Sequence, residues 1–204
     1  MSAAQVGALT NSQIQALKAA DWQGLTTTQA AGLQTSQIQA ISPSVIVALS
    51  TAVIQSLNTS QVDALSTAEV AALTTGQVDA LTTAQVNNLL TSQVAALTAS
   101  QVAGLTTNQV QNGLSTTQVA ALTATAVTGL TTTDIQALTT DQVQSISTGD
   151  VAALKTTQIA ALTTSEISNF TNAQLGALLY QQIAALSSTQ MGALSTTQIT
   201  YLKV

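Results

Sequence analysis

The chain repeats an eight-residue pattern in a single register from Ser2 to Leu202. Splitting the sequence after each recurrent leucine gives repeats such as Thr10–Leu17 (TNSQIQAL) and Thr74–Leu81 (TTGQVDAL). Twenty-five repeats fill this span, and one of them, Thr106–Leu114, carries a single extra residue. The consensus is [S/T]-T-x-Q-[V/I]-x-A-L, whose positions we number 1 to 8. A period this short allows one small element per repeat, and such arrays bury a core only by stacking.

Two positions of each repeat are reserved for a core. Position 5 is always apolar, and position 8 is almost always Leu. Position 5 departs from Val or Ile only at Trp22, Ala30, Leu175 and Met191, and position 8 departs from Leu only at Ile41, Ile146 and Phe170. Position 7 is usually Ala, Gly or Ser, which predicts that another backbone approaches closely there.

The polar half of the repeat predicts a helix start. Ser or Thr at position 1 and Gln at position 4 form a capping box, in which each side chain accepts a hydrogen bond from the other residue's backbone amide. Position 5 is then N4 and the preceding Leu is N′, the two positions joined by a hydrophobic staple. The one proline, Pro43, falls at N1, where proline is best tolerated. Acidic residues replace Gln at position 4 in five repeats, as Asp21, Glu69, Asp134, Asp150 and Glu166, and they suit the first turn of a helix.

These patterns predict an all-α solenoid of about 25 short capped helices, forming one array over residues 1–204. A single long helix is excluded, because eight residues advance two turns plus about 80° and the apolar stripe would circle the helix. A β-solenoid is the main alternative, since Thr and Val favour strands. Positions 5 and 8 differ by an odd number, however, which places them on opposite faces of a strand and on one side of a helix. We therefore favour helices.

Composition limits the partners of this chain. Hydrophobic residues make up 46% and charged residues only 5%, and the net charge is −5. The only basic residues are Lys18, Lys155 and Lys203, so nucleic-acid binding is disfavoured, because Lys and Arg supply most of that affinity. No apolar run approaches the roughly 18 residues of a membrane span. The residues after Met1 do not resemble a secretory signal peptide.

No catalytic, cofactor-binding or metal site is predicted. His and Cys are absent, which removes the commonest general base, the thiol nucleophile and the usual transition-metal ligands. Asp134, Asp141 and Asp150 lie within one stretch but lack a calcium-loop pattern. Asp63 and Asp79 occupy position 6 two repeats apart and are candidates to share one face of the array, which we interpret as a solvated edge.

Four aromatic residues gather toward the chain ends: Trp22, Phe170, Tyr180 and Tyr201. We interpret them as core fillers of atypical end repeats, with an aromatic binding site as the alternative. The regularly spaced Thr, Ser and Gln side chains predict a nearly uncharged surface dense in hydrogen-bonding groups. Such a surface suits contact with solvent, with another copy of the chain or with a glycan.

The recurring string L-T-T-x-Q-[V/I]-x-A-L, as in Leu73–Leu81 and Leu130–Leu138, resembles the Thr/Gln-rich tandem repeats of very large bacterial secreted or cell-surface proteins of the adhesin-like kind. The resemblance covers essentially the whole chain. It implies an extracellular, non-enzymatic spacer or adhesive module. The motif also resembles the helix start in TAL effector repeats, but the long two-helix unit and the basic charge of that family are missing, so no DNA-binding role is carried over.

Three functions stay open from the sequence. The first is a structural stalk or filament module at the cell surface that self-associates, because no polar terminal repeats are evident. The second is a binding surface for a patterned ligand such as a polysaccharide or ice. The third is an intracellular protein-interaction solenoid. No enzymatic activity is expected.

Overall fold

The computed structural model describes residues 1–202; Val204 and Lys203, one of the three lysines named above, lie outside the described residues. Residues 1–202 form 23 α-helices, one π-helical segment and one 3-10 segment, and they include no strand. Each eight-residue repeat supplies one of these elements. The prediction of an all-α solenoid is therefore confirmed, and the β-solenoid alternative is wrong.

The chain divides into two compact regions, an N-terminal region of residues 1–97 and a C-terminal region of residues 98–204. The division falls between Leu97, which ends one repeat, and Thr98, which begins the next. Whole repeats therefore lie on either side of it.

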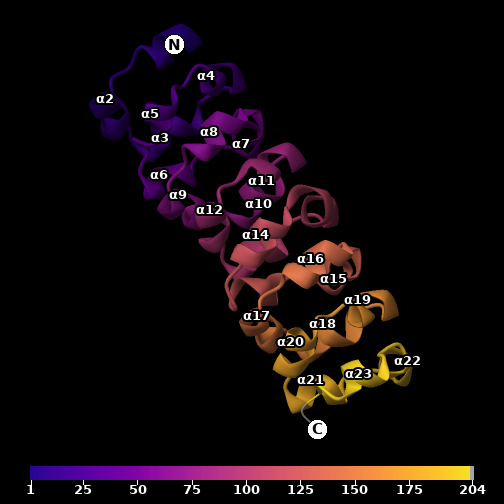
Figure 1. Ribbon diagram of the computed structural model, residues 1–204. Helices are drawn as coiled ribbons and strands as arrows, with labels where there is room; N and C mark the ends of the chain where they lie inside the picture. The colour runs from indigo at the N-terminus through magenta and orange to yellow at the C-terminus, as the bar shows by residue number, and fades with distance from the viewer. Residues whose placement is uncertain (203–204) are drawn as a thin grey trace. The chain divides into compact units, whose positions relative to one another are not determined.

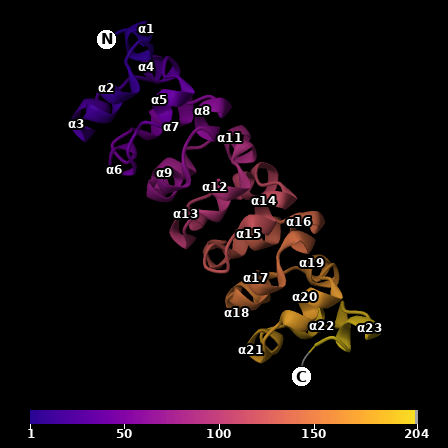
Figure 2. The same cartoon turned by 60° about the vertical axis from the view of Figure 1, so that its left-hand side comes forward.

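In the N-terminal region, each helix packs against the helices three repeats before and after it, which sorts the helices into three files. The first file contains α1 (Ala3–Gly7), α4 (Thr27–Ala31), α7 (Thr51–Ser56) and α10 (Thr75–Asp79). The second contains α2 (Asn11–Ala16), α5 (Thr35–Ile38), α8 (Thr59–Asp63) and α11 (Thr83–Asn88), which follow one another in a row in Figure 2. The third contains α3 (Ala19–Gln23), α6 (Pro43–Ile46), α9 (Thr67–Ala72) and α12 (Thr91–Ala95), which form a row in Figure 1.

The C-terminal region has the same arrangement of files. One file contains α13 (Ala99–Ala103), η2 (Ala126–Gly129), α17 (Thr148–Ala153) and α20 (Asn172–Ala177). A second contains η1 (Gln109–Gly113), α15 (Thr132–Ala137), α18 (Thr156–Ala161) and α21 (Tyr180–Ala184). The third contains α14 (Thr116–Ala121), α16 (Thr140–Ser145), α19 (Thr164–Ser168) and α22 (Ser188–Gly192), and α23 (Thr196–Ile199) is the last helix along the chain.

A capping box begins most of these helices, as predicted, whereas α6 and α7, whose repeats carry Val at position 4, lack it. At α10 the Thr74 backbone is extended, with φ −70° and ψ 158°. The Oγ1 of Thr74 accepts from the Gln77 amide at 3.2 Å, and the Oε1 of Gln77 accepts from the Thr74 amide at 2.8 Å. Pro43 occupies the first turn of α6, as expected. The α-helices span four to six residues, because each helix ends before position 8 and the next repeat begins with an extended cap.

The core consists of positions 5 and 8, as predicted. Val62 and Leu65 are 0% and 3% exposed. Helices this short are marginal alone, and burying one Val and one Leu contributes roughly 3–6 kcal/mol when neighbouring repeats cover them. The files supply that cover, so stability belongs to the stack and not to the single repeat.

Close backbone approach at position 7 is confirmed at two glycines. A Cβ at Gly32 would lie 2.5 Å from the carbonyl oxygen of Ala3, three repeats earlier, and a Cβ at Gly129 would lie 2.8 Å from the carbonyl carbon of Ala99. Gly24 also occupies position 7, but nothing lies within 4 Å of a Cβ there. A small residue at position 7 is therefore required by a backbone contact in some repeats, whereas in others a larger side chain would meet no neighbouring atom.

Two repeats deviate from the α-helical element. The repeat Thr106–Leu114 absorbs its extra residue as the π-helical turn η1, which keeps Val110 and Leu114 buried. The repeat 123–130 has Ala126 in place of Gln at position 4 and forms the 3-10 segment η2. Both repeats thus keep their two core residues, although the helix between them changes.

Candidate functional site

The most regular polar feature of this chain is a ladder of buried glutamines. The Nε2 of Gln77 donates to the carbonyl oxygens of Ile46 and Leu49, at 2.9 and 2.8 Å. Ile46 and Leu49 are positions 5 and 8 of the repeat four earlier. Since the Oε1 of Gln77 serves the capping box of its own helix, one amide both starts a helix and ties it to an earlier turn.

The ladder recurs in both compact regions. In the N-terminal region, the same pair of carbonyls four repeats earlier receives bonds from Gln37, Gln61, Gln85 and Gln93. In the C-terminal region, it receives bonds from Gln142, Gln158, Gln174, Gln182 and Gln190. Helices pack three repeats apart while glutamines reach four repeats back. Within each region, a superhelical turn therefore takes between three and four repeats.

The expectation that glutamine belongs to the exposed polar surface is wrong for position 4. Gln61 is 1% exposed and Gln93 is 1% exposed. By contrast, Gln5 and Gln13 are exposed, and no turn among the described residues covers their side chains. Burial of the amide therefore follows from the earlier turn that covers it. A sequence signal existed, because Glu would serve the capping box equally well and yet replaces Gln in only two repeats.

The acidic substitutions at position 4 keep the cap and lose the ladder. The Ser66 amide donates to Glu69 Oε2 at 2.6 Å, and the Thr131 amide donates to Asp134 Oδ2 at 2.9 Å. A carboxylate has no donor for the carbonyls of the earlier turn. Burial raises the pKa of the Glu69 carboxyl above its ordinary value of 4.5, and the hydrogen bonds from Ser66 oppose this shift.

Hydroxyl groups remain on the outside at position 2. Thr27, Thr51 and Thr75 stand on successive helices of one N-terminal file, and all three are exposed. The C-terminal file that begins with α14 presents a similar line of exposed residues: Thr116, Thr140, Thr164 and Ser188. Position 1 hydroxyls accept from backbone amides, as Thr74 Oγ1 does, whereas these position 2 residues are exposed. The exposed hydroxyls are thus ordered in lines along the files.

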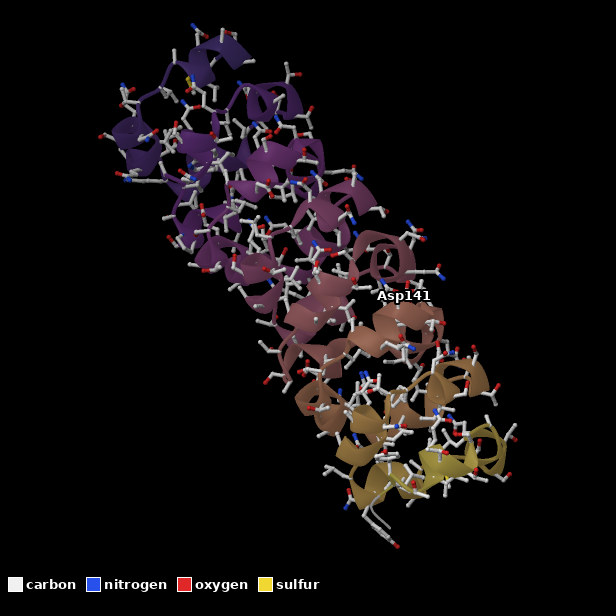
Figure 3. All side chains as sticks on the ribbon, in the orientation of Figure 1. Asp141 is labelled. Carbon is white, nitrogen blue, oxygen red and sulfur yellow. The ribbon has the colours of Figure 1, made fainter. Side chains whose placement is uncertain are left out.

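The carboxylates singled out from the sequence do not come together. Asp63 and Asp79 lie on α8 and α10, which belong to different files, so they do not share one face. Asp134 and Asp150 are buried cap residues, whereas Asp141 lies exposed on α16, where Figure 3 labels it. Among the described residues, no three His, Cys, Asp or Glu side chains are grouped to hold a metal ion.

The aromatic residues divide into two pairs. Trp22 and Phe170 are each 2% exposed and fill core positions 5 and 8, as predicted. Tyr180 and Tyr201 are 72% and 45% exposed, so their interpretation as core fillers is wrong. The reason is their place in the repeat, since positions 2 and 7 do not face the core.

No described helix is long and apolar enough to cross a membrane.

Four stretches of the chain match a model of the ALTTAQ repeat. They are residues 46–75, 63–91, 70–107 and 143–179. These six letters occur literally at Ala80–Gln85, as positions 7 and 8 of one repeat and positions 1 to 4 of the next. No curated protein matches the sequence. The comparison supports a tandem-repeat protein, and the adhesin-like bacterial origin stays a prediction.

Proposed function

We propose that the chain is a non-enzymatic structural repeat module that serves as a stalk or adhesive spacer in a bacterial surface or secreted protein. The observation that carries this proposal is the glutamine ladder. It ties each turn of the stack to the turn before it through bonds such as Gln61 Nε2 to Leu33 O, 2.7 Å long. The recurring polar groups of the repeat are thereby used to build the array, which fits a role in spacing and not in chemistry.

A spacer of this kind lengthens by a constant amount when repeats are added in phase with the files. We would insert a second copy of residues 74–97, which are three repeats, directly after Leu97 and measure particle dimensions by small-angle X-ray scattering. The maximum dimension is expected to increase while the cross-section stays constant. An unchanged maximum dimension, or a thicker cross-section, would contradict the spacer.

Self-association and surface location are elements of the proposal with their own tests. Sedimentation velocity over a wide concentration range should show larger species at high concentration, and a strict monomer would remove self-association without removing the stalk. Fractionation of cells that make the native protein should place it outside the cytoplasm. A purely cytoplasmic protein would favour the intracellular interaction solenoid.

The exposed hydroxyl lines support a second candidate, a surface for a patterned ligand. Successive helices in a file are expected to lie about 8–10 Å apart, so Thr27, Thr51 and Thr75 offer a regular uncharged row. Glycan arrays and thermal hysteresis would test polysaccharide and ice as ligands. Replacing all three residues by Val should abolish any signal that this row carries, and no signal with the unaltered chain in either assay would remove this candidate.

A further inference from the structure

Glu69 is the one Glu in the N-terminal region at the ladder position of its repeat. It is 1% exposed, and its Oε2 accepts from the Ser66 amide at 2.6 Å, as Gln Oε1 does elsewhere. Its other oxygen, Oε1, is buried and has no hydrogen-bond partner. Glu69 Oε1 takes the place that the donor Nε2 of Gln has in the other repeats, and it is this oxygen that has no partner.

The repeat register identifies what this oxygen faces. In the flanking repeats, Gln61 donates to Ala30 O and Leu33 O, and Gln77 donates to Ile46 O and Leu49 O. By the same offsets, the carbonyls presented to Glu69 are those of Ile38 and Ile41. The Ile38 oxygen already accepts from the Ile41 amide at 3.0 Å, whereas the Ile41 oxygen accepts no hydrogen bond in the described chain.

An ionised carboxylate is incompatible with this position. Its buried oxygen would meet carbonyl lone pairs, and both an unpaired charge and an unpaired acceptor are costly when buried. A neutral carboxylic acid removes both costs, because its O–H is a donor of the kind that Gln supplies.

No nearby charge offers another solution. The helices packed against α9 are α6 and α12, and the repeat that carries Ile38 and Ile41 is that of α5. None of these three repeats contains an acidic or basic residue. The nearest carboxyls along the chain are those of Asp63 and Asp79, in the two flanking repeats.

We propose that Glu69 is protonated in the folded chain, that its O–H donates to the carbonyl oxygen of Ile41, and that release of this proton loosens the stack between α5 and α9. The stability of the array then depends on pH at one defined turn, between α5 and α9. The direction of the pKa shift agrees, since burial raises the pKa of Glu69 above 4.5. Because the folded state holds the proton more tightly, this contribution to stability is complete below the ordinary pKa and is lost as pH rises through the raised one.

The test compares the full chain with its Glu69→Gln variant by thermal unfolding across a pH series. Gln is the regular residue at this position, so the variant is expected to fold. The two melting temperatures should coincide near pH 4, and the unaltered chain should fall below Glu69→Gln by a few degrees as pH rises toward 8. Asp79→Asn is the matched control, because it removes an exposed carboxyl one repeat away and should produce no such widening gap.

A second measurement reports the proton directly. Infrared difference spectra between the unaltered chain and Glu69→Gln should show the carbonyl band of a neutral carboxylic acid at pH values where exposed carboxyls are ionised. Absence of that band, a gap in melting temperature that does not change with pH, or an unaltered chain that gains stability relative to Glu69→Gln as pH rises would each overturn the proposal. The last outcome would indicate an ionised Glu69 stabilised by a bound cation.

Discussion

The Nε2 of Gln61 donates a 2.7 Å hydrogen bond to the carbonyl oxygen of Leu33, 28 residues earlier in the sequence. Leu33 ends the repeat of α4, and Gln61 lies in the first turn of α8, so the bond joins two turns of the stack. The same side chain accepts from the Asn58 amide at 2.9 Å through its Oε1. Both halves of one buried amide are therefore in use.

Replacing Gln61 by Leu should destabilise the N-terminal region by about 2–4 kcal/mol, because the Leu33 carbonyl and the Asn58 amide lose their partners. Urea unfolding followed by circular dichroism would measure the loss. Gln13→Leu is the control, since Gln13 is exposed and makes only its capping bonds. Equal losses for the two variants would show that the ladder contributes nothing beyond the cap.

Glu166 should make the C-terminal region sensitive to pH. Burial raises the pKa of its carboxyl above the ordinary 4.5, and hydrogen bonds from Thr163 oppose the shift. A raised folded-state pKa means that the contribution to stability is present below the ordinary value and is lost as pH rises through the raised one. Glu166→Gln should therefore be the more stable chain at neutral pH and equal at about pH 4. Thermal unfolding of Asp141→Asn, an exposed carboxyl, should show no such divergence.

Gly32 and Gly24 both occupy position 7, in adjacent repeats, and should respond to alanine in opposite directions. A Cβ at Gly32 would meet the Ala3 carbonyl oxygen at 2.5 Å, so Gly32→Ala should cost about 1–3 kcal/mol. A Cβ at Gly24 meets nothing within 4 Å, and Gly24→Ala should stabilise by about 0.4–1 kcal/mol by restricting the unfolded chain. Chemical denaturation would measure the free energy of unfolding of both variants. An undiminished free energy for Gly32→Ala would show that the backbone around Ala3 can shift to accept the Cβ at little cost.

Thr74 and Thr75 are neighbours with different roles. Thr74 caps α10 by accepting from the Gln77 amide, so Thr74→Ala should cost about 1 kcal/mol. Thr75 is exposed at the first helical position, and Thr75→Ala should change stability by less than about 0.5 kcal/mol. The pair can be compared in one series of urea titrations. A larger loss at Thr75 would reverse the assignment of caps to position 1.

Deleting Gly113 should restore a regular repeat. The nine residues Thr106–Leu114 fold as the π-helical segment η1, and removing Gly113 leaves TTNQVQNL, which fits the consensus. Because π-turns absorb single insertions, the variant should keep its stability and its helical circular dichroism. Deleting Ala120 instead shortens the regular repeat of α14 to seven residues and moves a core position, so it should destabilise strongly. Equal damage from both deletions would show that η1 is required.

The repeat pattern was sufficient to predict the local structure. Thr74 and Gln77 mark the start of α10, Pro43 falls at a first helical position, and Val62 and Leu65 face the core. These features depend on contacts within about five residues, which is the range over which capping and side-chain spacing act. The number of helical elements therefore followed from the number of repeats.

The sequence by itself thus determined where each helix begins, which two side chains it buries and that single repeats must stack. Only the tertiary structure decided that helices pack three repeats apart, that Gln61 and its equivalents are buried and bonded four repeats back, and that Tyr180 is exposed. The physical reason is distance along the chain. A Thr and Gln capping box looks the same wherever it occurs, whereas the partner of the free Nε2 depends on how many repeats complete a turn, and no single repeat encodes that number.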